Sequence, residues 1–404
     1  MKKYGLVVLI FLPLVFLFPT RAFAEDSSYS CSVTHQTVST IPRSFFGMFT
    51  PINRIPVSGD QQLKLFQRIK DSGIYSVRVQ IQWHRIERVE NEYQWENYDS
   101  ILQTIESVGL RALPVLIGVP SWARPSTGPM ARKIVIDPER YEDWQDFVAE
   151  ATRRYGVNGG TVANVASDWE IWNEPNGENF FQGTPQDMVT TLNLAYQTIK
   201  SIDPQSKVWS QAASTTGLTG TRDFFEAIVK DGYFDVLTIH LYATTEKAIE
   251  LATSAQQYLR ENGNSVNKEA KLSITETNPL PVGHQCESVN SLSEQEMADI
   301  ITNHYACLSQ AGADSVYYFM ALDLPDPSCS GGTVKVGILN PDLTPRALYS
   351  AIKEMITIVS PQTPLGDLNS DGKVDIFDYN ILVENFGNPY TIFDYNTLVE
   401  RFGT

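Results

Sequence analysis

Between Ser44 and about Ile358, hydrophobic and polar positions repeat one pattern: an amphipathic helix, a glycine and then a short β-rich run. In YDSILQTIESVG, residues 98–109, apolar residues recur at helical spacing, and Gly109 stands where a left-handed helix cap belongs. The β-rich run LRALPVLIGV follows it. The same order is found in LKLFQRIKDSG before YSVRVQIQW, FFEAIVKDG before YFDVLTIHLY, and ADIITNHYACLSQAGA before DSVYYFMALD.

The β-rich runs predict the fold class. Their starts lie roughly 30–55 residues apart, which is typical of βα units, and strands that alternate with helices form a parallel sheet. Eight such units in roughly 310 residues fit a closed (β/α)₈ TIM barrel, with a doubly wound open sheet as the alternative. The eight runs are Ser44–Thr50, Ser76–Trp83, Arg111–Val119, Ala166–Trp172, Lys207–Ala213, Asp235–Tyr242, Lys271–Thr275 and Ser315–Leu322.

A second, smaller domain follows the barrel domain, which we place at residues 25–359. Ser360–Leu365 carries two prolines in a polar run and is predicted to be a linker. Within residues 366–404, IFDYNILVENFG at Ile376–Gly387 recurs as IFDYNTLVERFG 16 residues further on. This repeat predicts two short amphipathic helices, so the α/β barrel is expected to be followed by a small α-helical module.

The first 24 residues have the features of a secretory signal peptide. Lys2 and Lys3 precede an apolar run from Leu6 to Phe18, and Ala22-Phe23-Ala24 forms a cleavage signal before Glu25. An uncleaved membrane anchor is the alternative, but the run is shorter than the ~20 residues that span a bilayer. We therefore expect a secreted protein without a membrane span after cleavage.

Four cysteines remain after that cleavage. Export to an oxidising compartment permits disulfides, and four cysteines allow three pairings. We favour Cys286–Cys329, because both residues fall in loops after neighbouring predicted strands. The other two cysteines are Cys31 and Cys307, and the alternative is that some of the four stay as free buried thiols.

Composition narrows the ligand class. The chain is 42% hydrophobic, as globular proteins are, and has a formal net charge of −16. Phosphate binding needs clusters of Lys and Arg, which this sequence lacks, so a nucleic-acid partner is not expected. The acidic balance tolerates neutral ligands such as sugars. The histidines outside the strand ends show no metal-ligand spacing and are expected to be structural or solvated: His35, His84, His284 and His304.

Two glutamates lie just beyond predicted strands, where TIM barrels carry their chemistry. Glu174 follows the fourth strand and Glu276 ends the seventh, whereas Glu170 lies inside the fourth strand and Asp168 at its start. A single such glutamate would more simply form a salt bridge or a helix cap. Two carboxyl groups in one barrel mouth suit glycoside hydrolysis, in which one is protonated and the other ionised. We expect apolar walls and like charge to raise the pKa of the acid.

These motifs resemble clan A glycoside hydrolases, whose barrels carry Asn-Glu-Pro after strand 4 and a glutamate after strand 7. WEIWNEPN together with SITETN is most similar to glycoside hydrolase family 39, and the resemblance extends over residues 44–356. It implies a retaining double displacement, with Glu174 as general acid/base and Glu276 as nucleophile. It also implies a carbohydrate substrate whose sugar the sequence leaves open.

The resemblance implies further site residues. Asn173 would hydrogen-bond the sugar 2-hydroxyl, and His240 and Tyr242 would hold Glu276 and the substrate. Arg78 would keep Glu276 ionised, unless it pairs with Glu170 instead.

Aromatic residues are the candidates for the sugar-stacking walls. Trp83 and Trp122 could stack on sugar rings, or they could be ordinary core aromatics. A tryptophan expected near the end of strand 8 is missing, and Tyr317, Tyr318 and Phe319 stand there instead. The floor of the sugar site therefore stays undecided.

The start of the tail has the register of an EF-hand loop. Oxygen side chains occupy loop positions 1, 3, 5, 9 and 12, Gly372 stands at position 6, and Lys373 would offer its backbone carbonyl at position 7. The loop resembles a type I dockerin, but the second repeat has lost its loop, so we expect one structural Ca²⁺. A cohesin-type scaffold protein could bind this module, or the module could only stabilise the chain. The side-chain ligands would be Asp367, Asn369, Asp371, Asp375 and Asp378.

Two functions therefore compete. The first is a secreted retaining glycoside hydrolase with a calcium-binding tail and no catalytic cofactor. The second is a non-catalytic carbohydrate-binding or scaffold-attached barrel, which would have no reason to keep both Glu174 and Glu276.

Overall fold

The computed structural model places Cys31–Thr404 in one compact unit. The predicted signal peptide, residues 1–24, and the predicted linker, residues 360–365, lie outside the described residues. Among the helices described, none is both long and apolar enough to traverse a bilayer. The described residues are 31, 41–51, 59–157, 160, 162, 164–219, 222–280, 290–325, 332–359, 366, 368, 374–387 and 392–403.

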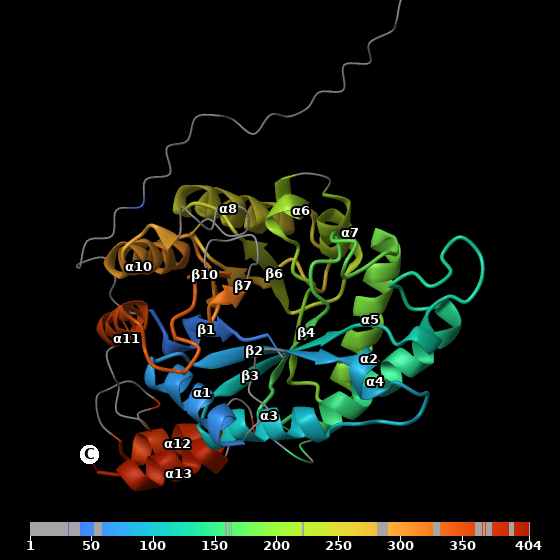
Figure 1. The fold of residues 1–404 in the computed structure, drawn as a ribbon. Coiled ribbons are helices and arrows are strands. Elements are labelled where there is room, and N and C mark those ends of the chain that lie inside the picture. Colours follow the sequence, from blue (N-terminus) through green and yellow to red (C-terminus); the bar gives the residue numbers. More distant parts are fainter. Residues whose placement is uncertain are drawn as a thin grey trace, which may run out of the picture. The chain divides into compact units, whose positions relative to one another are not determined.

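Eight parallel strands form a closed barrel in sequence order (Figure 1). Seven of the eight predicted runs contain one of these strands, and β7 begins with its predicted run but continues two residues beyond it, so the barrel is confirmed and the open sheet is wrong. The strands pair β1 with β2 and so on to β8, which closes on β1. Their bounds are β1 Phe46–Phe49, β2 Ser76–Gln82, β3 Arg111–Ile117, β4 Asp168–Ile171, β5 Lys207–Trp209, β6 Val236–Leu241, β7 Lys271–Thr277 and β8 Ser315–Phe319.

Helices surround the strands, as Figure 1 shows. The sequence specifies where several of them begin. Thr184 and Asp187 form a capping box before α5, and Ser293 and Glu296 form another before α10. The helices are α1 Gly59–Asp71, α2 Trp83–Ile86, α3 Glu96–Ser107, α4 Tyr141–Tyr155, α5 Pro185–Ile202, α6 Thr215–Thr219, α7 Asp223–Asp231, α8 Thr245–Asn262, α10 Glu294–Gln310 and α11 Ala347–Val359.

Short elements complete the barrel domain. A two-stranded antiparallel sheet of β9, Leu324–Pro325, and β10, Thr333–Val334, lies in the connection after β8. Single 3₁₀ turns are η1 Arg43–Phe45, η3 Ser121–Ala123 and η4 Pro138–Arg140.

The tail contains the two predicted helices, α12 Ile376–Glu384 and α13 Ile392–Arg401. Val374, Leu382 and Leu398 form their shared apolar core. Of the expected calcium ligands, Asp375 and Asp378 are described, whereas Asp367, Asn369, Asp371 and Lys373 lie outside the described residues.

The two described aspartates cap α12. Asp375 accepts the backbone N–H of Phe377, and buried Asp378 accepts those of Leu368 at 2.6 Å and Asp375 at 2.8 Å. Asp378 thereby closes the loop between its second and twelfth positions. Calcium binding stays a prediction.

A disulfide joins Cys31 to Cys307 on α10, across 276 residues of sequence. The sequence did not favour this pair, because nothing local to Cys31 shows that it reaches α10. The favoured pair, Cys286–Cys329, lies outside the described residues. It is the one second pairing that the observed bond leaves open.

Removing this cross-link should destabilise the protein. Closure of so long a loop restricts the unfolded chain, and such bonds contribute about 2–4 kcal/mol. We expect Cys31→Ser with Cys307→Ser to unfold at a lower urea midpoint than wild type under non-reducing conditions. An unchanged midpoint would show that the bond contributes nothing to stability.

Candidate active site

Glu174 is presented by a strained turn at the end of β4. Trp172 and Glu174 have φ angles of 71° and 42°, in the left-handed region that non-glycine residues seldom adopt. Backbone hydrogen bonds hold this turn: the N–H of Trp172 donates to Leu116 O at 2.9 Å and that of Glu174 to Ala212 O at 3.0 Å. Such strain persists where the surroundings over-determine it, and it commonly marks a functional site.

Glu276 is presented by a β-bulge. The pairing of β6 with β7 runs from Ile239 opposite Ile274 to His240 opposite Glu276, which leaves Thr275 as an extra residue. Neighbouring side chains on a regular strand face opposite ways. Here the Thr275 hydroxyl donates to Glu170 at 3.0 Å, and Glu276 accepts from Arg78 at 2.7 Å. The bulge thus directs both side chains into the barrel.

Arg78 on β2 is fully buried at the centre of this polar network. Its Nε lies 2.5 Å from Glu170 Oε2, its Nη1 lies 2.7 Å from Glu276 Oε1, and its Nη2 donates to Asn173 Oδ1 at 2.9 Å. Arg78 therefore pairs with Glu170 and with Glu276 at the same time. The two pairings that the sequence left as alternatives both occur. Burial lowers the pKa of Arg78, but the charges of both carboxylates outweigh burial and raise it above the usual value.

His240 and Tyr242, which lie at the end of β6 and just beyond it, connect the two strand-end glutamates. His240 Nδ1 lies 2.8 Å from Glu174 Oε1 and 3.7 Å from Glu276 Oε2. The Tyr242 hydroxyl donates to Glu276 Oε2 in a short hydrogen bond. Burial and the charge of Glu276 raise the pKa of Tyr242 well above its ordinary value, so the hydroxyl keeps its proton.

Glu174, His240 and Glu276 form one compact constellation. One carboxylate oxygen of each glutamate and a ring nitrogen of His240 all lie within 4.8 Å of one another. Among the described residues this is the one group that could converge on a metal ion. Arg78 already places a fixed positive charge against Glu276.

The pKa of Glu174 is lower than usual, and our prediction of a raised pKa is wrong for the free protein. Burial alone would raise it, but the hydrogen bond and positive charge of His240, together with Arg78, lower it overall. The expectation of a raised pKa rested on apolar walls and like charge, and no local pattern places His240 within hydrogen-bond distance of Glu174.

Asn173 lies beside Glu174 with only 3% of its surface exposed. Its Oδ1 accepts from Arg78, so its amide nitrogen is the group left to donate. The contact of Asn173 with a sugar hydroxyl stays a prediction.

Trp83 does not line the site, contrary to one of the two sequence alternatives. Its ring is fully buried, its Nε1 donates to Glu87 at 2.7 Å, and it packs against Trp144. The reason is that α2 begins at this residue and directs its ring into the helix layer. Trp122 is half-buried, with Arg140 over its ring at 5.6 Å, and stays a candidate.

Phe319, at the end of β8, is an aromatic residue next to the site. Its ring stacks on Phe49 at 5.6 Å and meets Tyr242 edge-on at 5.5 Å. Tyr317 and Tyr318 are instead buried, with their hydroxyls bonded to Ser76 and to Val336 O. Of the three aromatic residues that end β8, only Phe319 is left to form a floor.

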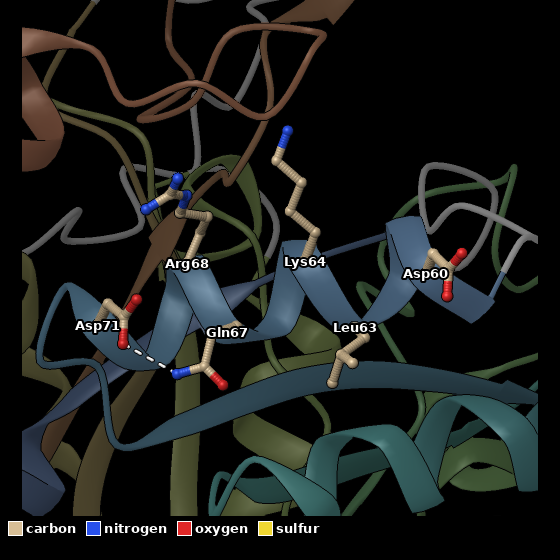
Figure 2. A pocket seen from close by; sticks show the side chains of 6 residues that line it. All are labelled: Asp60, Leu63, Lys64, Gln67, Arg68 and Asp71. Atoms are coloured by element: carbon tan, nitrogen blue, oxygen red, sulfur yellow. Dashed lines mark hydrogen bonds between the residues drawn. The ribbon is translucent and has the colours of Figure 1, made fainter.

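A surface hollow lies along α1 (Figure 2). It contains a Gln67–Asp71 hydrogen bond of 2.9 Å but none of the residues described above. Helix α1 belongs to the outer layer, and we assign the hollow no role. Its lining residues are Asp60, Leu63, Lys64, Gln67, Arg68 and Asp71.

Fold and site together define a class: a (β/α)₈ barrel with two carboxyl groups from β4 and β7 in one mouth, as in glycoside hydrolases. Residues 36–321 match the family described as glycosyl hydrolases family 39, and the chain belongs to this family.

Similar proteins carry related descriptions. A "Beta-xylosidase" of Caldicellulosiruptor saccharolyticus is 24% identical over 201 residues, which is 47% of this chain but only 39% of the relative. A family 39 glycoside hydrolase from Bacteroides cellulosilyticus WH2 superposes with a TM-score of 0.61 at 20% identity, covering 82% of this chain and 64% of the other. A monomeric beta-xylosidase from Caulobacter crescentus CB15 gives 0.60 at 15% identity, covering 78% and 68%. At these identities the structural matches establish the fold.

Proposed function

We propose that this protein is a secreted retaining glycoside hydrolase that cleaves O-glycosidic bonds of a glycoside, oligosaccharide or polysaccharide. The observation that carries the proposal is the close approach of Glu174 and Glu276, with oxygens within 4.8 Å. Retaining enzymes hold their carboxyl groups about 5–5.5 Å apart, whereas inverting enzymes leave roughly 6.5–9.5 Å for a water. A barrel that only bound sugar would not need this pair.

The proposed first step is attack on the anomeric carbon by ionised Glu276. A bond forms between that carbon and a Glu276 oxygen, and the bond to the leaving oxygen breaks. Protonated Glu174 gives its proton to this oxygen. Arg78 supports the ionised form of Glu276, and Tyr242 fixes the orientation of its carboxylate.

In the second step Glu174 acts as a general base instead of a general acid. Ionised Glu174 takes a proton from water, whose oxygen attacks the anomeric carbon and releases Glu276 as the carboxylate. Two inversions return the original configuration. Asn173 donates to the sugar 2-hydroxyl in both steps, while Phe319 and Trp122 offer aromatic faces to the sugar rings.

We propose a β-xyloside as the first substrate to try, in view of the xylosidase names of similar proteins. The test is hydrolysis of 4-nitrophenyl β-xyloside, β-glucoside, β-mannoside and β-glucuronide, with proton NMR of the first anomer released. Turnover with retained configuration is expected. No turnover across the panel, or an inverted first product, would overturn the proposal.

Replacement of His240 by glutamine should shift the pH dependence. His240 lowers the pKa of Glu174, so wild type loses the protonated acid early as pH rises. Without the imidazole the pKa of Glu174 rises, and the basic limb of kcat/KM should move to higher pH. The matched control, Tyr242→Phe, leaves the His240–Glu174 contact intact and should leave that limb in place. A basic limb that stays or moves down in His240→Gln would contradict this assignment.

For the tail we propose one structural Ca²⁺ and attachment to a cohesin-type scaffold protein. The oxygen side chains of the loop suit calcium, and buried Asp378 closes that loop. Attachment is supported by large apolar side chains that α12, α13 and the residues after them leave about half exposed. These are Ile376, Phe377, Val383, Phe386, Val399 and Phe402.

Calorimetric titration of the full chain with CaCl₂ tests the calcium proposal. We expect about one site, absent from a chain that ends at Val359. Equal heats from the two chains would contradict calcium binding by the tail. If the full chain binds calcium but no cohesin, the tail would only stabilise the protein.

A further inference from the structure

His304 on α10 is a fully buried histidine that the proposed reaction does not use. Its ring bridges two elements. Its Nε2 lies 2.8 Å from the hydroxyl of Thr277 on β7, and its Nδ1 lies 3.1 Å from the hydroxyl of Thr245 on α8. Thr277 is the residue directly after Glu276, so His304 contacts the strand that carries the proposed nucleophile.

The protons in this contact have one consistent order. The Thr277 hydroxyl donates to Leu241 O at 2.7 Å, so its oxygen is left to accept from His304 Nε2–H. Nδ1 then has a free lone pair, which accepts from the Thr245 hydroxyl. Burial lowers the pKa of His304 to about 3, which keeps the ring neutral and this order intact at ordinary pH.

The position of Thr277 relative to the bulge makes the contact important. A bulge locally disrupts the ladder between strands, and here the ladder resumes at His240–Glu276 and Leu241–Thr277. The Thr275 hydroxyl bonds to Glu170 inside the barrel. The Thr277 hydroxyl bonds to Leu241 O and to the ring of His304. Glu276 lies between these two attachment points.

The same bond couples β7 to the other site residues. Leu241 is the residue between His240 and Tyr242, and His240 lies opposite Glu276 in the register of the two strands. The hydroxyl of Thr277 therefore joins the backbone that carries both partners of the glutamates to the backbone that carries Glu276.

We propose that His304 and Thr277 form a clamp that positions the Glu276 carboxylate against Arg78 and Tyr242. The inference rests on the proposed function, in which Glu276 is the nucleophile. His304 is a positioning residue, because it acts through Thr277 and the strand rather than on the sugar.

The test compares Thr277→Val, which removes the hydroxyl at equal size, with Thr277→Ser, which keeps it. Displacement of a reacting group by about 1 Å can cost 10²-fold, so we expect kcat on 4-nitrophenyl β-xyloside to fall about 10- to 100-fold in Thr277→Val with little change in KM. Thr277→Ser should stay near wild type. The control is Thr152→Val, whose fully buried hydroxyl donates to Val148 O at 2.8 Å within α4 and should leave kcat unchanged.

Two further measurements separate positioning from stability. Thermal midpoints are recorded for all variants and kcat is measured well below them, so a loss of kcat confined to Thr277→Val is not unfolding. Thr245→Val loosens only the far side of His304, and a smaller loss in the same direction is expected. If Thr277→Val and Thr245→Val both keep the wild-type kcat, the clamp is overturned.

Crystal structures of wild type and of Thr277→Val test the clamp independently of any activity measurement. We expect the Glu276 carboxylate to leave hydrogen-bond distance of Tyr242 in the variant, and an unmoved carboxylate would overturn the inference. If wild type hydrolyses none of the four glycosides, the proposed function fails. The clamp is then decided by this geometry alone.

Discussion

Replacement of Glu276 by glutamine is expected to lower kcat/KM on aryl glycosides by on the order of 10⁴-fold or more, as loss of the nucleophile does in other enzymes that use covalent catalysis. The amide keeps the size of the side chain but cannot form the glycosyl ester. The loss should be the same for good and poor leaving groups, because attack on the anomeric carbon fails in either case.

Replacement of Glu174 by glutamine should behave differently. Loss of a general acid costs about 10²–10⁴-fold when the leaving oxygen needs a proton. A 2,4-dinitrophenolate departs without one, so bond cleavage in 2,4-dinitrophenyl β-xyloside should be much less affected than in 4-nitrophenyl β-xyloside. The measurement is the first turnover followed by stopped flow.

The matched control for both is Glu178→Gln. Glu178 is an exposed glutamate four residues after Glu174, and the change should leave kcat/KM near wild type. Equal leaving-group dependence in Glu174→Gln and Glu276→Gln would contradict the division of roles. Unchanged turnover in both would sink the assignment of the active site.

The second large effect is expected for Arg78→Met. Removal of the guanidinium leaves Glu170 and Glu276 buried without their positive partner, and breaking such a buried pair costs about 3–5 kcal/mol. The free energy of unfolding from urea denaturation should fall by this amount. Activity should fall as well, because Glu276 loses the guanidinium hydrogen bond that holds its carboxylate.

A double variant separates the two consequences of losing Arg78. Arg78→Met with Glu170→Gln removes one of the two carboxylates that the single variant leaves buried and unpaired. The double variant should therefore be more stable than the single variant. It should not regain activity, because Glu276 is still without its guanidinium. Recovery of both properties together would show that Arg78 acts only on stability.

The barrel and the two glutamates could be predicted from the sequence because both signals are local. Amphipathic helices that end in glycine alternate with β-rich runs, and each run overlaps one observed strand. Glu174 and Glu276 follow from a position rule, since parallel strands bring their carboxyl ends to one face. The resemblance to family 39 rested on the same short motifs.

Other features depend on contacts between distant segments, which no local pattern reports. Cys31 reaches Cys307 across 276 residues, and the contact of His240 with Glu174 reverses the expected direction of the pKa shift. The burial of Trp83 depends on where α2 begins relative to β2. The choice of Phe319 over its two tyrosine neighbours depends on how β8 closes against β1.

By itself, the sequence determined the eight strands, the helices between them, the tail repeat and the identity of the two strand-end glutamates. Tertiary structure alone decided how those glutamates are oriented and charged. Closing the barrel brings Arg78 from β2 between β4 and β7, and the bulge at Thr275 turns Glu276 toward it. The physical reason is that periodicity depends on neighbours along the chain, whereas register and charge depend on neighbours in space.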